Sequence, residues 1–323
     1  MTGCSLDTHP VYFRYRIMLS VIINHSSSSS STSSALNCPK SSEESFSWDN
    51  VETPPIAYSL NRILGEGVSS IVYEATHAIH GVCAVKVMRD DYNDFAQEEI
   101  ALLRKVQGHT NMIKVFDTWE CDGVWHIAME KLEGSLSDVI DTMDDHAVYD
   151  FAKQLTSSIM FLHHVGIVHF DLKPHNMGYT FGPNGIIYKI LDFGLSELMS
   201  VVETDEFKDA LDSGDIKKVS LWYRPIEALT QPTIMNEKTD VWSIGCILYE
   251  LLTGAPLFDE LYEERPIEYN LKVYEDGIKS VHQLFSNKSK QVRHLAQLIL
   301  ECLEYDPETR LGAGLAWWNL VMN

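Results

Sequence analysis

Four polar side chains fall close together in the middle of the chain. Residues 169–176 read HFDLKPHN, and a DFG triplet begins at Asp192. Asp171 and Asp192 are carboxylates, Lys173 is a cation and Asn176 is an amide. Such a set could accept a proton, bind a hard cation and steady an anion. Taken singly, each residue also has a plain structural interpretation, such as a turn aspartate or a loop asparagine.

Two features upstream could handle a phosphate group. Gly65 and Gly67 lie between two expected strands, where glycine lets backbone N–H groups approach phosphate oxygens closely. On their own, these glycines fit a hairpin turn better. Lys86 lies in an apolar strand and shares neither neighbour's face, so it either points to solvent or reaches a phosphate. In the second case it needs a carboxylate partner, and Glu99 on the following expected helix is a better candidate than Glu98.

The elements that must position these residues change character after Gly134. Before it, the apolar pattern predicts one helix over 94–106 and strands near 58–67, 70–74, 82–88, 112–120 and 124–130. After it, wide apolar faces predict helices over 148–164, 238–252 and 291–303. A strand-rich part followed by a helix-rich part predicts an α+β chain with two lobes.

Taken together and in this order, the motifs resemble those of eukaryotic-type protein kinases. The pattern H-x-D-L-x-x-x-N followed by D-F-G, with a glycine loop and a strand lysine upstream, is the kinase signature set. Residues 220–227, SLWYRPIE, resemble the T-L-W-Y-R-A-P-E segment of cyclin-dependent and MAP kinases. The resemblance covers about residues 58–318. It implies the two-lobed kinase fold, with a small antiparallel β-sheet N-lobe carrying one regulatory helix and a larger, mainly helical C-lobe.

The resemblance implies a serine/threonine kinase that transfers the γ-phosphate of ATP to protein hydroxyls. Asp171 would act as the catalytic base, Lys173 would steady the transferring phosphate, and Asn176 and Asp192 would hold Mg²⁺. ATP would be held by the glycine loop, the strand lysine with its carboxylate, and the adenine-lining residues: Leu64, Gly65, Gly67, Val72, Ala84, Lys86, Glu99, Met129, Glu130 and Leu132.

Two further matches fall in the expected C-lobe. Asp240, in DVWSIG, would anchor the backbone of the catalytic loop. Glu227 would form a buried ion pair with Arg310, a contact that is costly to break from one side.

The sequence also departs from the family pattern. Phe170 replaces an Arg that often pairs with a phosphorylated residue of the activation segment, and a Phe cannot make a charge-assisted hydrogen bond. Asp215 falls where related kinases carry the phosphorylated threonine, so we expect activity without phosphorylation there. Gly178 stands where the family has an apolar adenine floor. We expect a looser ATP site, unless Met177 or Tyr179 fills the space.

The departures at Ser70, Phe170 and Gly178 keep a second hypothesis open, a pseudokinase that acts as a nucleotide-binding scaffold. Ser70 replaces the usual third glycine of the loop. Pseudokinases usually lose the phosphate lysine, the catalytic aspartate or the metal-binding aspartate. This chain keeps all three, so an active kinase is the leading interpretation.

Composition narrows the choice of partners. The chain has 323 residues, of which 46 are acidic and 25 basic, for a formal net charge of −21. This surplus argues against nucleic-acid and anionic-membrane binding and favours a basic protein substrate. No run reaches the roughly 18 to 20 apolar residues of a membrane span. The helix expected over 94–106 carries no cyclin-binding motif, so a regulatory subunit is not supported.

Cysteine spacing bears on the cellular compartment, and the Ser-rich start bears on where the folded domain begins. The six cysteines show no CxxC pair, which argues for free thiols in a reducing, intracellular compartment, cytoplasmic or nuclear. Residues 26–34 read SSSSSSTSS, a tract that buries nothing, so a disordered leader is expected over 1–57. The kinase domain is expected over 58–318, with its lobes divided as 58–132 and 133–318, and a short tail over 319–323.

Overall fold

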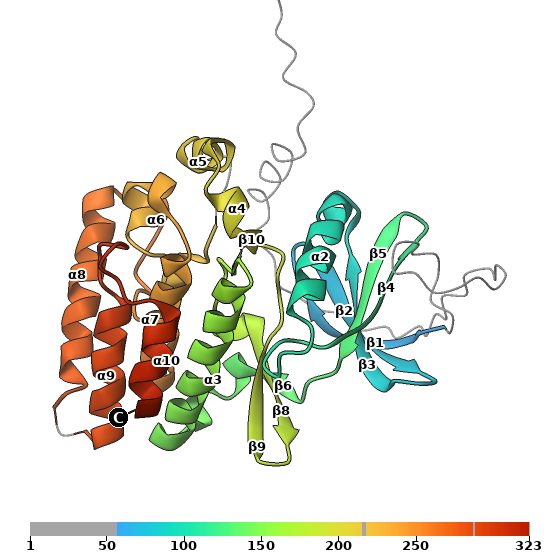
Figure 1. Ribbon diagram of the computed structural model, residues 1–323, viewed down its shortest axis with the longest axis horizontal. Helices are drawn as coiled ribbons and strands as arrows, with labels where there is room; N and C mark the ends of the chain where they lie inside the picture. The colour runs from blue at the N-terminus through green and yellow to red at the C-terminus, as the bar shows by residue number, and fades with distance from the viewer. Residues whose placement is uncertain (1–56, 215–217, 287, 323) are drawn as a thin grey trace, which may run out of the picture. The chain divides into compact units, whose positions relative to one another are not determined.

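The computed structural model describes residues 57–214, 218–286 and 288–322 (Figure 1). The expected leader, apart from its last residue, and Asp215 lie outside the described residues. The described part divides into two compact units. One comprises residues 57–100, 115–131 and 209–214, and the other comprises 101–114, 132–208 and the described residues from 218 onward.

The first unit is built on a five-stranded antiparallel sheet in the order β1-β2-β3-β5-β4. Its strands are β1 (Ser59–Glu66), β2 (Ser70–His77), β3 (Gly81–Met88), β4 (Val115–Cys121) and β5 (Val124–Glu130). A 3-10 helix (Asp90–Phe95) leads from β3 into α2 (Ala96–Val106). All five strands and the helix therefore match the sequence expectation.

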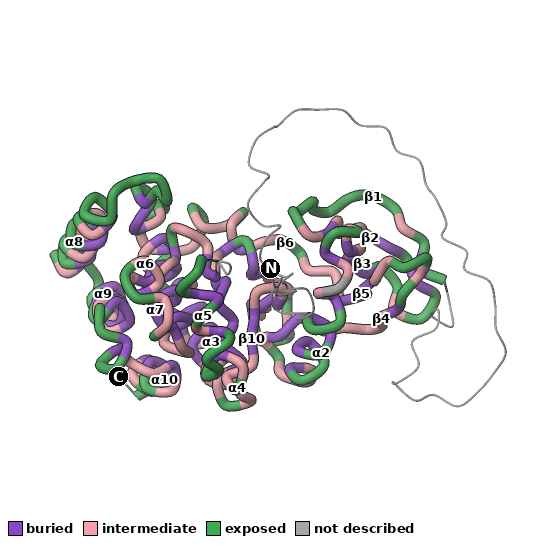
Figure 2. Tube along the Cα trace, turned by 90° about the horizontal axis from the view of Figure 1, so that it is seen from above, coloured by how far each residue is buried: buried purple, intermediate pink, exposed green. Residues whose placement is uncertain are grey.

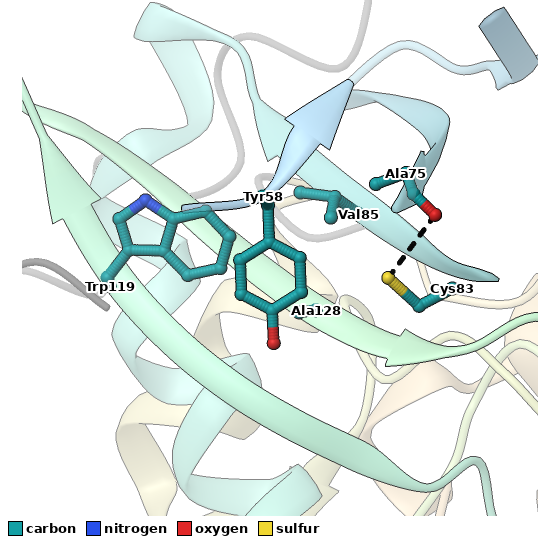
Figure 3. Packing of buried hydrophobic residues seen from close by; sticks show 6 residues of the cluster. All are labelled: Tyr58, Ala75, Cys83, Val85, Trp119 and Ala128. Atoms are coloured by element: carbon teal, nitrogen blue, oxygen red, sulfur yellow. Dashed lines mark hydrogen bonds between the residues drawn. The ribbon is translucent and has the colours of Figure 1, made fainter. Parts of the chain in front are cut away.

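One face of this sheet carries an apolar core (Figure 3). Cys83 and Val85 are entirely buried in it, and the Cys83 thiol donates a hydrogen bond to the Ala75 carbonyl at 3.6 Å. Tyr58 stacks on Trp119 with ring centroids 5.0 Å apart. Because successive strand residues point to opposite faces, this core leaves residues 84 and 86 of β3 on the other face.

The second unit is mainly helical. Helices α3, α7, α9 and α10 pack together (Figure 1), and buried stretches run along α3 and α7 (Figure 2). Its longer helices are α3 (Asp145–His164), α7 (Lys238–Thr253), α8 (Ile267–Gln283), α9 (Lys290–Cys302) and α10 (Ala313–Met322). The helices expected over 148–164, 238–252 and 291–303 are thus confirmed. The pattern analysis did not predict α8.

Short strands in the second unit hold the catalytic segments. The strands β6 (Gly134–Ser135), β8 (Met177–Gly182) and β9 (Gly185–Ile190) form one antiparallel sheet, and β7 (Ile167–Val168) pairs with β10 (Glu197–Leu198). Helices α4 (Met199–Val202) and α5 (Asp205–Asp212) lie between β10 and the SLWYRPIE segment. Helix α6 (Glu227–Thr230) begins at Glu227, the last residue of that segment. Helix α10 extends through residues 319–322, which were expected to be a tail. Within the described residues, no helix is long and apolar enough to cross a bilayer.

Candidate active site

Asp171 lies at the centre of a hydrogen-bonded network in the segment between β7 and β8. Its Oδ2 accepts hydrogen bonds from Lys173 Nζ at 2.7 Å and from Asn176 Nδ2 at 2.8 Å. Its Oδ1 accepts from the Ser220 hydroxyl at 2.6 Å and from the Ser220 amide at 3.1 Å. The carboxylate is 9% exposed. Both oxygens of Asp171 are therefore oriented by cationic or polar donors within one compact unit.

Asp240, near the start of α7, fixes the backbone that carries this network. Its carboxylate accepts the amide hydrogens of His169 and Phe170, each at 2.8 Å, and contacts His163 Nε2 at 2.9 Å. Phe170 adopts a positive φ of 61°, which is uncommon for a residue other than glycine. The amide hydrogen bonds hold the backbone in this conformation. The expected anchoring role of Asp240 is confirmed.

His169 supports the catalytic loop as a neutral ring. It is completely buried, and this burial lowers the pKa of its imidazole, although Asp240, Asp171 and Asp192 oppose the shift. Its Nδ1 accepts the Asp171 amide hydrogen at 3.2 Å. Nε2 therefore carries the proton, and it has no hydrogen-bond partner among the described residues. The ring acts as packing and as a backbone acceptor.

Asn176 and Asp192 offer oxygen atoms suited to a hard divalent cation. Asn176 donates through Nδ2 to both the carbonyl and Oδ2 of Asp171, so Oδ1 is the atom suited to a metal. Asp192 Oδ1 accepts the Gly194 amide hydrogen at 3.0 Å, which orients the carboxylate. The described residues contain no cluster of three or more His, Cys, Asp or Glu side chains able to hold a metal. This donor set fits a cation that keeps water and phosphate oxygens as its other ligands.

Lys86 and Glu99 form a buried ion pair in the first unit. Lys86 Nζ lies 2.6 Å and 2.9 Å from the two carboxylate oxygens of Glu99, and the side chains are 9% and 3% exposed. Lys86 comes from the middle of β3 and Glu99 from the first turn of α2. The pairing predicted from the sequence is confirmed, and the solvent-exposed alternative for Lys86 is wrong.

Three other residues expected to line a nucleotide in this unit, Val72, Ala84 and Met129, share the face that carries Lys86. Val72 on β2 pairs with Lys86, and Ala84 pairs with Met129 on β5. Directly opposite residues in an antiparallel pair point the same way, and so do residues two apart on one strand. These four side chains therefore line one face, opposite the core of Figure 3. Glu130 follows Met129 at the end of β5.

The glycine loop between β1 and β2 is a closed turn. The Gly67 amide donates to the Ser70 carbonyl at 2.9 Å, and Gly65 pairs with Val72. Arg89 holds the loop from the end of β3, because its Nε donates to the Gly67 carbonyl at 3.2 Å. Leu64 precedes these glycines on β1 and is 37% exposed.

The space beside Gly178 is already filled, by a residue we did not consider for it. A Cβ atom on Gly178 would lie 2.6 Å from Leu132 Cδ1 and 2.9 Å from the Gly134 carbonyl oxygen. The expectation was an open space unless Met177 or Tyr179 filled it, and Leu132 occupies it instead. Glycine at 178 is required because β6 and the Leu132 side chain approach it so closely.

Glu227 and Arg310 form the second predicted ion pair. The guanidinium binds both carboxylate oxygens, with nitrogen–oxygen distances of 2.7 Å and 2.8 Å, and its side chain is 0% exposed. It also donates to backbone carbonyls and lies 5.0 Å from the Trp242 ring centroid. The predicted buried pair is confirmed.

Two residues of the site were missed by sequence reasoning. The Ser220 hydroxyl donates a hydrogen bond to Asp171 and accepts one from Lys173 Nζ at 2.8 Å. Ser220 stood in a recognised motif but had not been assigned to the site. Lys218, two residues earlier, is buried against Phe170 and had no local signal in the sequence.

Comparison with known proteins agrees with this geometry. The family described as "Protein kinase domain" matches residues 58–317. A probable cell division protein kinase of Encephalitozoon cuniculi is 27% identical over 261 residues, covering 79% of this chain and 94% of the relative. Cyclin-dependent kinase 2 of Caenorhabditis elegans is 31% identical over 291 residues, covering 79% of this chain and 75% of the relative.

A third relative is not named as a cell division or cyclin-dependent kinase. A probable myosin light chain kinase of Dictyostelium discoideum is 29% identical over 289 residues, covering 84% of this chain and 85% of the relative. Membership of the family implies ATP, a divalent metal and protein substrates. The chain belongs to the protein kinase family, as a eukaryotic-type serine/threonine kinase.

Proposed function

We propose that the chain is an active kinase in which Asp171 is the catalytic base. The observation that carries this proposal is the network on Asp171, in which Lys173, Asn176 and Ser220 orient both carboxylate oxygens. Such orientation is what general-base chemistry needs, because the base must lie within hydrogen-bond reach of the proton it takes. The intact Lys86–Glu99 pair supports the same proposal from the nucleotide side.

In this mechanism the protein mainly positions groups and stabilises charge. When bound, ATP supplies the phosphoryl group and Mg²⁺ neutralises its charge. Asp171 orients the substrate hydroxyl and accepts its proton as the hydroxyl oxygen bonds to the γ-phosphorus and ADP leaves. Lys173 stabilises the charge on the transferring group. Asn176 and Asp192 would hold the Mg²⁺, as hard oxygen ligands.

The nucleotide would be held by the residues that the kinase pattern assigns to it. Lys86, fixed by Glu99, would bind the α- and β-phosphates, and the backbone amides of the glycine loop would approach the phosphates. The adenine would lie between Leu64, Val72 and Ala84. Backbone groups of Glu130 and Leu132 would pair with its edge, and Met129 would lie behind it as the gate residue.

The nucleotide site is tested with Lys86→Met. ATP with Mg²⁺ at about 100 times its dissociation constant should stabilise the wild type by about 2.7 kcal/mol, measured by thermal shift. We expect the variant to lose this stabilisation and to transfer no labelled phosphate. An equal shift in the two proteins would contradict the assignment. A pseudokinase scaffold would instead show the wild-type shift with no transfer to any substrate.

We also propose that activity does not depend on phosphorylation of the activation segment. Phe170 is 1% exposed and lies against Phe207, with ring centroids 6.1 Å apart, so the position that usually carries an Arg offers no cation to a phosphate. Treatment with a phosphatase should leave kcat unchanged relative to enzyme mixed with heat-killed phosphatase. A large loss of activity after treatment would overturn this proposal.

A further inference from the structure

Lys218 is a buried lysine in the segment that leads into SLWYRPIE. Its side chain is 0% exposed, which is rare for lysine unless its charge is paired. Nζ donates to the Leu195 carbonyl at 2.8 Å and to Glu197 Oε2 at 3.3 Å. Leu195 follows the DFG triplet and Glu197 begins β10. The lysine therefore joins the two ends of the activation segment through its buried ammonium.

Two aromatic rings also lie near this ammonium. Nζ lies 5.6 Å from the ring centroid of Phe170 and 5.7 Å from that of Phe207. A desolvated ammonium within about 6 Å of an aromatic face is attracted by the ring quadrupole. Phe170 immediately precedes Asp171, so the same cluster contacts the catalytic loop.

The residues after Lys218 adopt a conformation that needs support. Val219 has a φ of 69°, an outlier for a β-branched residue. Its carbonyl accepts hydrogen bonds from Arg224 Nε at 3.1 Å and Nη2 at 2.9 Å. Such a conformation persists only where the surrounding structure holds it on both sides. Lys218 holds the side before Val219, and Ser220, bonded to Asp171 Oδ1, holds the side after it.

We propose that Lys218 is a positioning residue for the phosphoryl-transfer reaction. Its buried ammonium, clamped by Glu197, Leu195 and the two rings, fixes the backbone at Val219 so that Ser220 stays on Asp171. The cluster supplies from within the chain a cation that holds the activation segment. This inference rests on the proposed role of Asp171 as the base.

The test must separate positioning from folding. Lys218→Met alone would break a buried ion pair from one side, and such variants often fail to fold. The double variant Lys218→Met/Glu197→Met replaces the pair by two apolar side chains of similar length, an exchange that is often tolerated. Lys279→Met, on the exposed face of α8, is the matched control because its ion pair with Asp276 is at the surface.

We expect the folded double variant to lose about 100-fold in kcat, the scale associated with a displacement of about 1 Å in an active site. The KM for ATP should stay unchanged, because the cluster does not include the residues proposed to hold ATP. The control should keep the wild-type kcat. A folded double variant with the wild-type kcat would overturn the proposal.

A second measurement does not depend on activity. Hydrogen exchange at the Ser220 amide, whose N–H donates to Asp171 Oδ1, should be faster in the double variant than in the wild type and the control. If the double variant shows faster exchange at Ser220 but the wild type transfers no phosphate, the positioning contact is real and the kinase proposal is wrong. Unchanged exchange at Ser220 would mean that Lys218 does not position it.

Discussion

At the residue scale, the proposed activity depends on a few side chains whose types the motifs determine. Lys86 and Glu99 form the contact that their positions in the sequence predict. The hydrogen bond between Asn176 and Asp171 was not predicted, although both residues stand in the same motif. Gly178 is different. Its small size permits a close approach of Leu132 and β6, and the sequence alone did not identify which residue fills the space.

The Gly178 contact predicts an overpacking penalty. Gly178→Ala should lower the free energy of unfolding by about 1 to 3 kcal/mol, because the new Cβ meets both Leu132 and the backbone oxygen of Gly134. Adding Leu132→Ala should remove part of this loss, with a coupling of at least about 0.5 kcal/mol, measured by urea denaturation. Gly312→Ala is the control, because a Cβ there would meet nothing within 4 Å. Equal free energies of unfolding for Gly178→Ala and Gly312→Ala would contradict the packing argument.

At the element scale, strong periodicity made most of the fold predictable. The short apolar run of β3 and the wide apolar faces of α3, α7 and α9 identified these elements from the sequence. Helix α8 was missed because two of its four buried positions are Asn270 and Gly277, which leaves only Tyr274 and Val281 as apolar signals on the buried face. The contacts of Ser220 with Asp171 and of Lys218 with Glu197 were missed because residues 49 and 21 positions apart meet only after the chain has folded.

His126 on strand β5 leads to a prediction about how the stability of the fold depends on pH. Burial lowers the pKa of His126, although a hydrogen bond to the Val124 carbonyl opposes the shift. At this imidazole the folded chain therefore binds fewer protons than the unfolded chain near and below pH 6.5, and the same holds at the buried His169. The stability present above pH 6.5 should fall as the pH drops through that value, by at most about 1.4 kcal/mol per pH unit for each histidine.

A variant can assign part of this pH dependence to His126. His126→Phe keeps a ring on Trp119, which the imidazole stacks on at a centroid distance of 4.9 Å, and removes the titrating group. Its free energy of unfolding should depend less steeply on pH between 7.5 and 5.5, measured by urea denaturation at several pH values. His146→Phe, at an exposed position on α3, is the matched control. Identical slopes for His126→Phe and the wild type would contradict the burial argument.

At the scale of the whole molecule, the net charge is the feature that bears on the choice of substrate. With 46 acidic and 25 basic residues, the chain attracts cationic partners over long distances at low salt. We therefore propose that its protein substrates are basic. Between 10 mM and 150 mM salt, where the screening length falls from about 30 Å to about 8 Å, the KM for a basic peptide should rise by about 10-fold or more. A neutral peptide with the same target residue should change little. Equal salt dependence of the two peptides would argue against electrostatic steering.

The central claim, that Asp171 is the base of an active kinase, is tested most directly by steady-state phosphate transfer in the wild type and in Asp171→Asn. We expect the wild type to phosphorylate serine or threonine in a basic protein. The variant should lose about 100- to 10,000-fold in kcat, the usual contribution of general-base catalysis, while ATP still raises its melting temperature. A wild type that binds ATP with Mg²⁺ and transfers no phosphate, or a variant that transfers at the wild-type rate, would contradict the account.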